Sequence, residues 1–186
     1  MKIKLTLLLI ALLLGAKMYS QATSSLTDVI SSAISERTYT TVPVTDQQLD
    51  LILKCGIKAP SAMNAQPWKF TVIRDDAAMK EIISDITPGN VIIIVSGTVS
   101  QTGTTPDFDC GLAAENIFLA AHGLGLGARI YGSPARNINA KKDAYQIPAG
   151  NKAIVAIRIG NVEKVVDATS GASPRKKVEE VVNYKK

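Results

Sequence analysis

Histidine, cysteine and aromatic residues are scarce in this chain of 186 residues, which contains one histidine, two cysteines and 5% aromatic residues. A lone imidazole, that of His122, excludes zinc sites built on two histidine ligands and makes metal-dependent hydrolysis a poor expectation. Two cysteines are also too few for a disulfide framework. Because 46% of the residues are hydrophobic, the chain can bury a core, and we expect one folded domain rather than disorder.

The N-terminal segment has the pattern of a secretory signal peptide. Lys2 and Lys4 precede a largely apolar run at residues 5–14, which is followed by small residues. This run is shorter than the roughly 20 apolar residues that cross a bilayer. We expect cleavage near Ser20, so that residues 1–20 are a signal peptide and 21–186 form an exported, periplasmic or secreted domain without stable membrane insertion. An uncleaved N-terminal anchor is the alternative.

The positive charge of the chain is partly a property of that segment. Loss of residues 1–20 would remove Lys2, Lys4 and Lys17 but no acidic residue, so the formal charge would fall from +5 to +2. A nucleic-acid partner is therefore not expected. Several cations remain together near the C-terminus, and they form either a solvated tail or a source of cations for a phosphate group: Arg175, Lys176, Lys177, Lys185 and Lys186.

The hydrophobic pattern mixes helices with a few strands and predicts an α+β fold in a single domain. Thr45 and Gln48 form a capping-box pattern at the start of one helix. The predicted helices are 26–36, 45–58, 76–85 and 111–124, with a further helix after Pro134. The predicted strands are 69–74, 91–95 and 153–160, with an extended segment at 129–131. We expect a loop at 96–108 and a short strand in the tail at 173–186.

The most informative stretch is residues 59–68, APSAMNAQPW, between a predicted helix and a predicted strand. Two prolines bracket Ser61, Asn64 and Gln66, whose side chains are good hydrogen-bonding groups. On a rigid loop such groups suit recognition of a polar, planar heterocycle or its polyol chain. The alternative is an ordinary turn in which these side chains bond to nearby backbone groups.

This stretch resembles the FMN-dependent nitroreductase family, in which a helix ending in A-P-S/T is followed by x-x-N-x-Q-P-W and a strand. Other stretches resemble the family in the same order along the chain: S-E-R-T-Y with a later P-V at 35–44, D-C-G-L-A-A-E-N and a glycine-rich end at 109–127, I-Y-G at 130–132, and R-K before V-E-E-V-V at 175–182. The resemblance covers residues 26–182. It implies a three-layer, nitroreductase-like fold with a mostly antiparallel central sheet flanked by helices, in a homodimer.

The resemblance also implies where FMN binds. Ser35, Arg37 and Arg175 would hold the phosphate, with Lys176 in reserve, because a phosphate with nearly two negative charges needs cations and donors.

Asn64 would bridge groups of the ribityl chain or the ring edge, and Ser61 would either fix the loop or touch the flavin. Gly132 would let the backbone approach the ring, so that an N–H stabilises charge near N5, while Tyr131 packs beside it.

Two features depart from the family. Ala33 stands where members usually carry the first phosphate-binding arginine, which predicts weaker binding of FMN unless Arg175 or Lys176 compensates. The passage from Asp85 to Asp109 is shorter than in larger members, which predicts a more open substrate pocket.

Other residues that attract attention have simpler interpretations. Trp68 is expected to anchor the core, His122 to be structural or exposed, and Asp109 to cap a helix. Glycines 123, 125 and 127 follow a helix rather than a strand, so they do not form a dinucleotide fingerprint. Cys55 and Cys110 are expected to be free, buried thiols.

The function implied by the resemblance is an FMN-dependent oxidoreductase. By a ping-pong mechanism it would use NADH or NADPH to reduce nitroaromatics, quinones or similar electron-poor acceptors. The flavin carries the chemistry, so no protein residue is expected to be a catalytic acid, base or nucleophile, and no metal is expected. Two alternatives remain: an exported flavin-binding protein of the same fold without NAD(P)H turnover, and a flavin-dependent dehalogenase or ring-modifying enzyme of the same superfamily.

Overall fold

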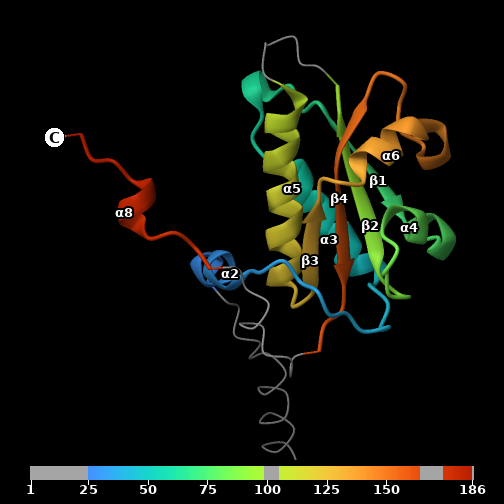
Figure 1. The fold of residues 1–186 in the computed structure, drawn as a ribbon, viewed down its shortest axis with the longest axis horizontal. Helices are drawn as coiled ribbons and strands as arrows, with labels where there is room; N and C mark the ends of the chain where they lie inside the picture. Colours follow the sequence, from blue (N-terminus) through green and yellow to red (C-terminus); the bar gives the residue numbers. More distant parts are fainter. Residues whose placement is uncertain (1–24, 99–104, 164–173, 186) are drawn as a thin grey trace, which may run out of the picture.

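The computed structural model describes residues 25–98, 105–163 and 174–185, and it contains a four-stranded antiparallel sheet (Figure 1). The strand order is β1-β2-β4-β3, and each neighbouring pair is antiparallel. The strands are β1 (Trp68–Ile73), β2 (Val91–Gly97), β3 (Gly127–Tyr131) and β4 (Lys152–Gly160). The strands predicted at 69–74, 91–95 and 153–160 and the extended segment predicted at 129–131 are therefore confirmed. One edge of the sheet is β1, whose only ladder in the described chain is with β2.

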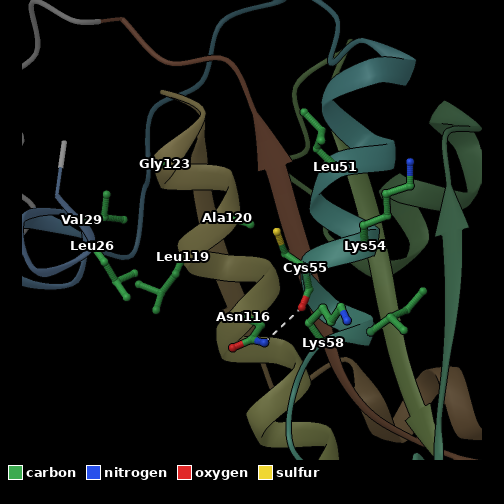
Figure 2. Close-up of a pocket in the computed structure, with 11 residues that line it drawn as sticks. Leu26, Val29, Leu51, Lys54, Cys55, Lys58, Asn116, Leu119, Ala120 and Gly123 are labelled. Atoms are coloured by element: carbon green, nitrogen blue, oxygen red, sulfur yellow. Dashed lines mark hydrogen bonds between the residues drawn. The ribbon is translucent and has the colours of Figure 1, made fainter. Parts of the chain in front are cut away.

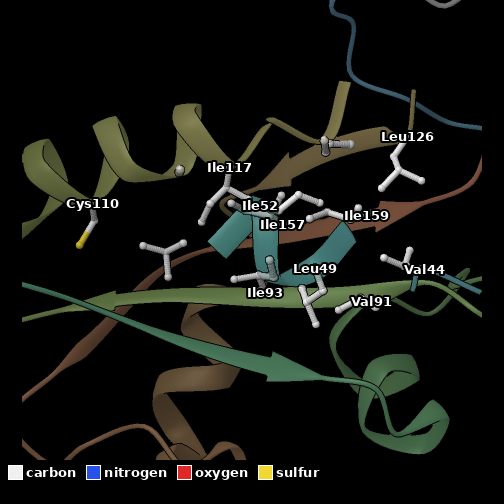
Figure 3. Close-up of a cluster of buried hydrophobic side chains, with 14 residues drawn as sticks. Val44, Leu49, Ile52, Val91, Ile93, Cys110, Ile117, Leu126, Ile157 and Ile159 are labelled. Carbon is white, nitrogen blue, oxygen red and sulfur yellow. The ribbon is translucent and has the colours of Figure 1, made fainter. Parts of the chain in front are cut away.

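Helices cover both faces of the sheet and make the three predicted layers. Helices α3 (Asp46–Ile57) and α5 (Pro106–Gly123) lie on one face, and α4 (Asp76–Ile82) and α6 (Ala135–Ala140) on the other (Figure 1). Every residue of β2 is buried. Val91, Ile93 and Val95 belong to the core under α3 and α5 (Figure 3), whereas the alternate residues Ile92 and Ile94 belong to the core under α4 and α6. Successive side chains of β2 thus point to opposite faces of the sheet, and both faces are covered.

The close packing of α3 on α5 requires a glycine. A Cβ atom added at Gly56 would lie 2.7 Å from Cγ1 of Ile117 on α5. The N-terminal end of α3 has the predicted capping box, in which the Thr45 side chain accepts from the Gln48 backbone and the Gln48 side chain accepts from the Thr45 backbone. These two features set where α3 begins and how near it lies to α5.

Three elements differ from the sequence prediction. Helix α5 begins at Pro106, inside the predicted loop, because proline has no N–H to lose in the first turn of a helix. Helix α2 (Leu26–Ser32) ends at Ala33, whose backbone is extended. The tail forms a short helix, α8 (Val178–Val181), where a strand was predicted, and it becomes extended at Val182. Helix α8 lies away from the sheet (Figure 1).

The segment at residues 33–44 runs along one end of the sheet and is held there by several contacts. Ser35 forms a parallel bridge with Ala128 of β3, and the Tyr39 ring lies 4.0 Å from the guanidinium carbon of Arg158 on β4. Arg158 is buried and donates to the side chains of Asn90 and Thr87. These contacts fix the predicted phosphate-binding segment against the sheet.

The proposed signal segment at residues 1–20 lies outside the described residues. In the described part of the chain, no helix is long and apolar enough to span a membrane. The two short 3₁₀ helices are η1 (Ala62–Asn64) and η2 (Lys142–Tyr145), and only η1 lies in a stretch of interest for function.

Candidate functional site

The 61–66 loop, which contains η1, is closed by its own polar side chains. The Gln66 backbone N–H donates to Ser61 Oγ at 3.0 Å, and Gln66 Nε2 donates to Asn64 Oδ1 at 3.2 Å. Met63, Asn64 and Gln66 all have positive φ angles, of 51°, 56° and 47°. Such angles cost on the order of 1–3 kcal/mol for each non-glycine residue and concentrate at functional sites. The loop is therefore strained. The hydrogen bond from Gln66 fixes the orientation of the Asn64 side-chain amide.

Asp109 does not cap a helix, contrary to the sequence prediction. The helix begins three residues earlier, at Pro106, so Asp109 lies inside its first turns. Its side chain is fully buried, and Oδ1 accepts the backbone N–H of Ala62 at 3.1 Å. Asp109 thus joins the 61–66 loop to the N-terminal end of α5. The sequence alone does not reveal this hydrogen bond, because only the fold brings residues 62 and 109 together.

A second group of predicted site residues lies near the other end of α5. Ser35 and Arg175 line the same pocket, of about 260 Å³. Ala33, where the family's arginine was expected, lines it too, so this pocket is the place that an arginine would have reached. Glu115 of α5 also lines the pocket, and sequence reasoning did not single it out. The other lining residues are apolar: Ile30, Phe118, Leu119 and Ile130.

The remaining predicted residues lie outside this pocket. Arg37 and Lys176 are exposed and are not among the residues that line it. Tyr131 ends β3 and lies 4.8 Å from the guanidinium carbon of Arg129. Gly132 is exposed, and a Cβ atom added there would meet no atom within 4 Å. The backbone at Gly132 is therefore open to a ligand, while the roles of Arg37 and Lys176 stay predictions.

The two groups of polar residues do not share a pocket in a single chain. Asp109 holds the 61–66 loop near the start of α5, whereas the Ser35 bridge to Ala128 lies just beyond its end. From α5, the Ser35 pocket is lined by Glu115, Phe118 and Leu119, which follow Asp109 by about 9–15 Å at about 1.5 Å for each residue. No residue of the 61–66 loop lines the pocket that contains Ser35 and Arg175. Each chain therefore carries two separate groups of candidate site residues, which we call half-sites.

A large apolar groove lies between α2, α3 and α5 (Figure 2). Its volume is about 820 Å³. Leu26 of α2 points toward Leu119 of α5 in this view, and Asn116 donates to the Cys55 carbonyl at 3.1 Å across the floor. The cations Lys54 and Lys58 stand at its α3 side. Leu26 and Leu51 are 70% and 44% exposed, so the described part of the chain leaves considerable apolar surface of the groove without a cover.

The Cys110 thiol is not activated as a nucleophile. Burial, with the charges of Asp109 and Asp107 beside it, raises the pKa of the Cys110 thiol to about 12, so this thiol is not nucleophilic. Both cysteines are free, as predicted, but Cys55 is exposed rather than buried.

Burial lowers the pKa of His122, and its Nε2 is buried with no hydrogen-bond partner among the described residues. Phe118 packs against the imidazole ring with the two ring centroids 4.6 Å apart.

Comparison with known proteins identifies relatives of this arrangement. Residues 30–94 match the nitroreductase family. A candidate NADH dehydrogenase/NAD(P)H nitroreductase of Archaeoglobus fulgidus is 36% identical over 103 residues, which are 50% of this chain and 59% of that protein. A similarly described protein of Methanothermobacter thermautotrophicus is 34% identical over 110 residues, which are 54% of this chain and 57% of that protein. The matched region thus spans less than two thirds of either relative.

The fold is shared over a greater length. The crystal structure of a candidate nitroreductase from Desulfovibrio desulfuricans, solved in complex with FMN, superposes with a TM-score of 0.75. It is 29% identical to this chain, and the superposition covers 88% of this chain and 98% of that one. The family match includes Ser35 and the 61–66 loop, so it contains parts of both half-sites. In sequence over residues 30–94 and in fold over most of its length, the chain is similar to proteins of the nitroreductase family.

Proposed function

We propose that this protein is an FMN-dependent oxidoreductase that uses NADH or NADPH to reduce nitroaromatics, quinones or similar electron-poor acceptors by a ping-pong mechanism. The observation that carries the proposal is the pocket that Ser35 and Arg175 both line. These two residues are 140 positions apart in the sequence, and each was expected to bind the cofactor phosphate. The FMN-bound relative from Desulfovibrio desulfuricans supports the choice of cofactor.

The donor groups of the chain fit FMN in three respects. A hydroxyl and a guanidinium in one pocket suit a phosphate, because charge-assisted bonds from arginine to phosphate are strong and directional. The 61–66 loop supplies amide and hydroxyl groups for the polar edge of a ring or for a polyol. The backbone at Gly132 has open space beside it, so a ligand could come close to the Gly132 N–H.

When bound, FMN would supply the redox chemistry at its N5 atom, between a nicotinamide donor and the acceptor. The part of the protein is to bind and to orient. Ser35 and Arg175 would hold the phosphate, and Asn64 would direct an amide toward the ring or the ribityl chain. The Gly132 N–H would stabilise negative charge that develops near N5. The high pKa of Cys110 agrees with a site whose reactive group is the cofactor.

We propose further that the two half-sites meet in a homodimer. Because no residue of the 61–66 loop lines the Ser35 pocket within one chain, we place a twofold axis across α5 that would bring the loop of one subunit toward the Ser35 pocket of the other. The apolar groove between α2, α3 and α5 would be covered by the second copy. The free edge of β1 and the extended chain after Val182 would allow the C-terminal segment to pair with the partner's sheet.

The proposed function is tested by cofactor binding and reduction. The purified protein is mixed with FMN, separated from free FMN and treated anaerobically with NADH or NADPH while the flavin absorbance is recorded. Bound flavin that bleaches with either donor, and recovers when a quinone is added, is the expected result. A protein that stays colourless at high FMN concentration would contradict the proposal.

Flavin binding without turnover is the second candidate. It is favoured by Ala33, which places a methyl group where the phosphate pocket could have held another cation. The same experiment separates the two functions, because a flavin that binds but is bleached by neither donor supports the binding protein.

We also propose that residues 1–20 direct export and are removed. The two lysines ahead of an apolar run shorter than a membrane span support this proposal. The intact mass of the protein recovered from the periplasm or medium tests it. A mass that corresponds to the full chain of 186 residues would contradict cleavage.

A further inference from the structure

Asp109 is the only acidic residue in the described chain whose side chain is buried. Its exposed fraction is 0%, although carboxylates are almost never buried without partners. One oxygen, Oδ1, accepts the Ala62 N–H at 3.1 Å. The other, Oδ2, is buried with no hydrogen-bond partner among the described residues. Burial of a carboxylate costs folding free energy. The hydrogen bond between Asp109 and the 61–66 loop is therefore the feature that calls for a functional reason.

That hydrogen bond is made immediately before the strained part of the loop. Ala62 is followed by Met63 and Asn64, both of which have positive φ angles. A strained backbone persists only where surrounding contacts hold it. Within the loop, the Ser61 hydroxyl accepts the Gln66 N–H at 3.0 Å and closes the turn on itself. Asp109 is the contact that ties the turn to the rigid helix α5.

We infer that Asp109 is a positioning residue, which holds the 61–66 loop on α5 in the strained geometry that presents Asn64 to the cofactor. The bond from Asp109 fixes the start of the loop, and the Gln66 side chain then directs the Asn64 amide by donating to Asn64 Oδ1. Loss of the carboxylate would leave the Ala62 N–H without its acceptor and release the strain. The inference rests on the proposed function only in taking the loop to face FMN.

The first test measures the loop in the full-length protein without added cofactor. Amide hydrogen exchange is followed at Ala62 in Asp109→Ala and Asp109→Asn. Asparagine retains an oxygen that can accept from Ala62, so D109N is expected to protect this amide nearly as the parent does. D109A is expected to raise its exchange rate on the order of 10-fold or more. Asp107→Ala is the matched control, since Asp107 is exposed in the first turn of the same helix.

The second test follows the environment of Trp68, the only tryptophan in the chain. Trp68 begins β1 two residues after the loop and is partly buried against the core. D109A is expected to increase quenching of its fluorescence by acrylamide, with no such change in D109N or D107A. If D109A does not fold, Ala62→Pro removes the same hydrogen bond from the side of the donor and is expected to give the same fluorescence change.

The third test connects the loop to the cofactor. D109A is expected to weaken FMN binding on the order of 10-fold, with D109N restoring it. Equal exchange at Ala62 and equal quenching of Trp68 in D109A and the parent would overturn the positioning role. If the parent protein binds no FMN, the proposed function fails, whereas the exchange and fluorescence results still decide what Asp109 does.

Discussion

Ala33 stands where the resemblance to nitroreductases predicts an arginine, and its place in the structure makes that difference testable. It lines the pocket that contains Ser35 and Arg175. Ala33→Arg is expected to strengthen FMN binding about 10- to 100-fold, because one charge-assisted hydrogen bond contributes about 1.5–3 kcal/mol. Titration of the protein with FMN, followed by flavin fluorescence, measures the change.

Ser32→Arg is the matched control for Ala33→Arg. It adds the same charge one position earlier, on an exposed residue that is not among those lining the pocket. An equal gain in the two variants would mean that long-range attraction, rather than a contact in the pocket, accounts for the effect.

The single histidine makes the stability depend on pH in a predictable direction. Burial lowers the pKa of His122 in the folded protein, against the opposing effects of a hydrogen bond to the Ile34 backbone and of Glu36 nearby. The unfolded chain therefore binds a proton more readily, so this contribution is present above the unfolded pKa of about 6.5 and is lost as the pH falls below it. We expect the decrease in melting temperature between neutral and mildly acidic pH to be smaller in His122→Asn. An identical decrease in both proteins would show that His122 has no such role.

Individual site residues were predictable where a short motif carries them. Ser61, Asn64 and Gln66 stand in one stretch of ten residues, and the structure shows them bonded to one another. Asp109 and Glu115 could not be assigned in this way. Their importance comes from contacts with residue 62 and with the Ser35 pocket, and the tertiary fold alone creates these contacts.

Among the elements, the packing of α3 on α5 depends on the absence of a side chain at Gly56. Alanine normally favours a helix over glycine by about 1 kcal/mol. At Gly56 its Cβ atom would lie 2.7 Å from the Ile117 side chain, so Gly56→Ala is expected to destabilise the protein by about 1–3 kcal/mol. Urea unfolding followed by circular dichroism measures this loss.

Gly111 provides the opposite control within the same pair of helices. It lies in α5 with no atom within 4 Å of an added Cβ, so Gly111→Ala is expected to leave stability unchanged or to raise it by up to about 1 kcal/mol. A stabilising effect of G56A would contradict the close packing of the two helices.

The sequence predicts interior elements of this fold better than their ends. The β-branched run at residues 91–95 and the capping box of Thr45 and Gln48 are local signals, and both elements were found. The start of α5 was placed five residues too late because the proline at residue 106 was interpreted as part of a loop. The tail was predicted as a strand because its few valines do not distinguish a short helix from a strand, and α8 has no buried residue to fix its structure.

At the scale of the whole molecule, the uncovered groove provides a test of the homodimer. Leu51 lines the groove from α3 and is 44% exposed. Leu51→Glu is expected to convert the dimer to monomer, since a carboxylate would have to be buried in an apolar interface. Light scattering during size-exclusion chromatography measures the mass of each protein. Val42→Glu is the control, because Val42 is 57% exposed and is not among the groove residues.

Cys55 reports the same interface chemically. Its thiol lines the groove, whereas Cys110 is buried in the core. A thiol reagent is expected to modify Cys55 slowly in the parent dimer and rapidly in Leu51→Glu, with Cys110 modified only after unfolding. If Cys55 reacts at the same rate in both proteins, the second copy does not cover this groove.

The central claim is that each cofactor site takes one half from each subunit, and mixed dimers test it most directly. Ser35→Ala/Arg175→Ala damages one half-site, and Ser61→Ala/Asn64→Ala damages the other. Each variant alone is expected to bind FMN weakly. Equal amounts of the two, unfolded and refolded together, are expected to recover about a quarter of the parent's sites, since about half of the dimers would be mixed and each would hold one intact site. No recovery in mixed dimers whose formation is confirmed by mass spectrometry would contradict the shared site.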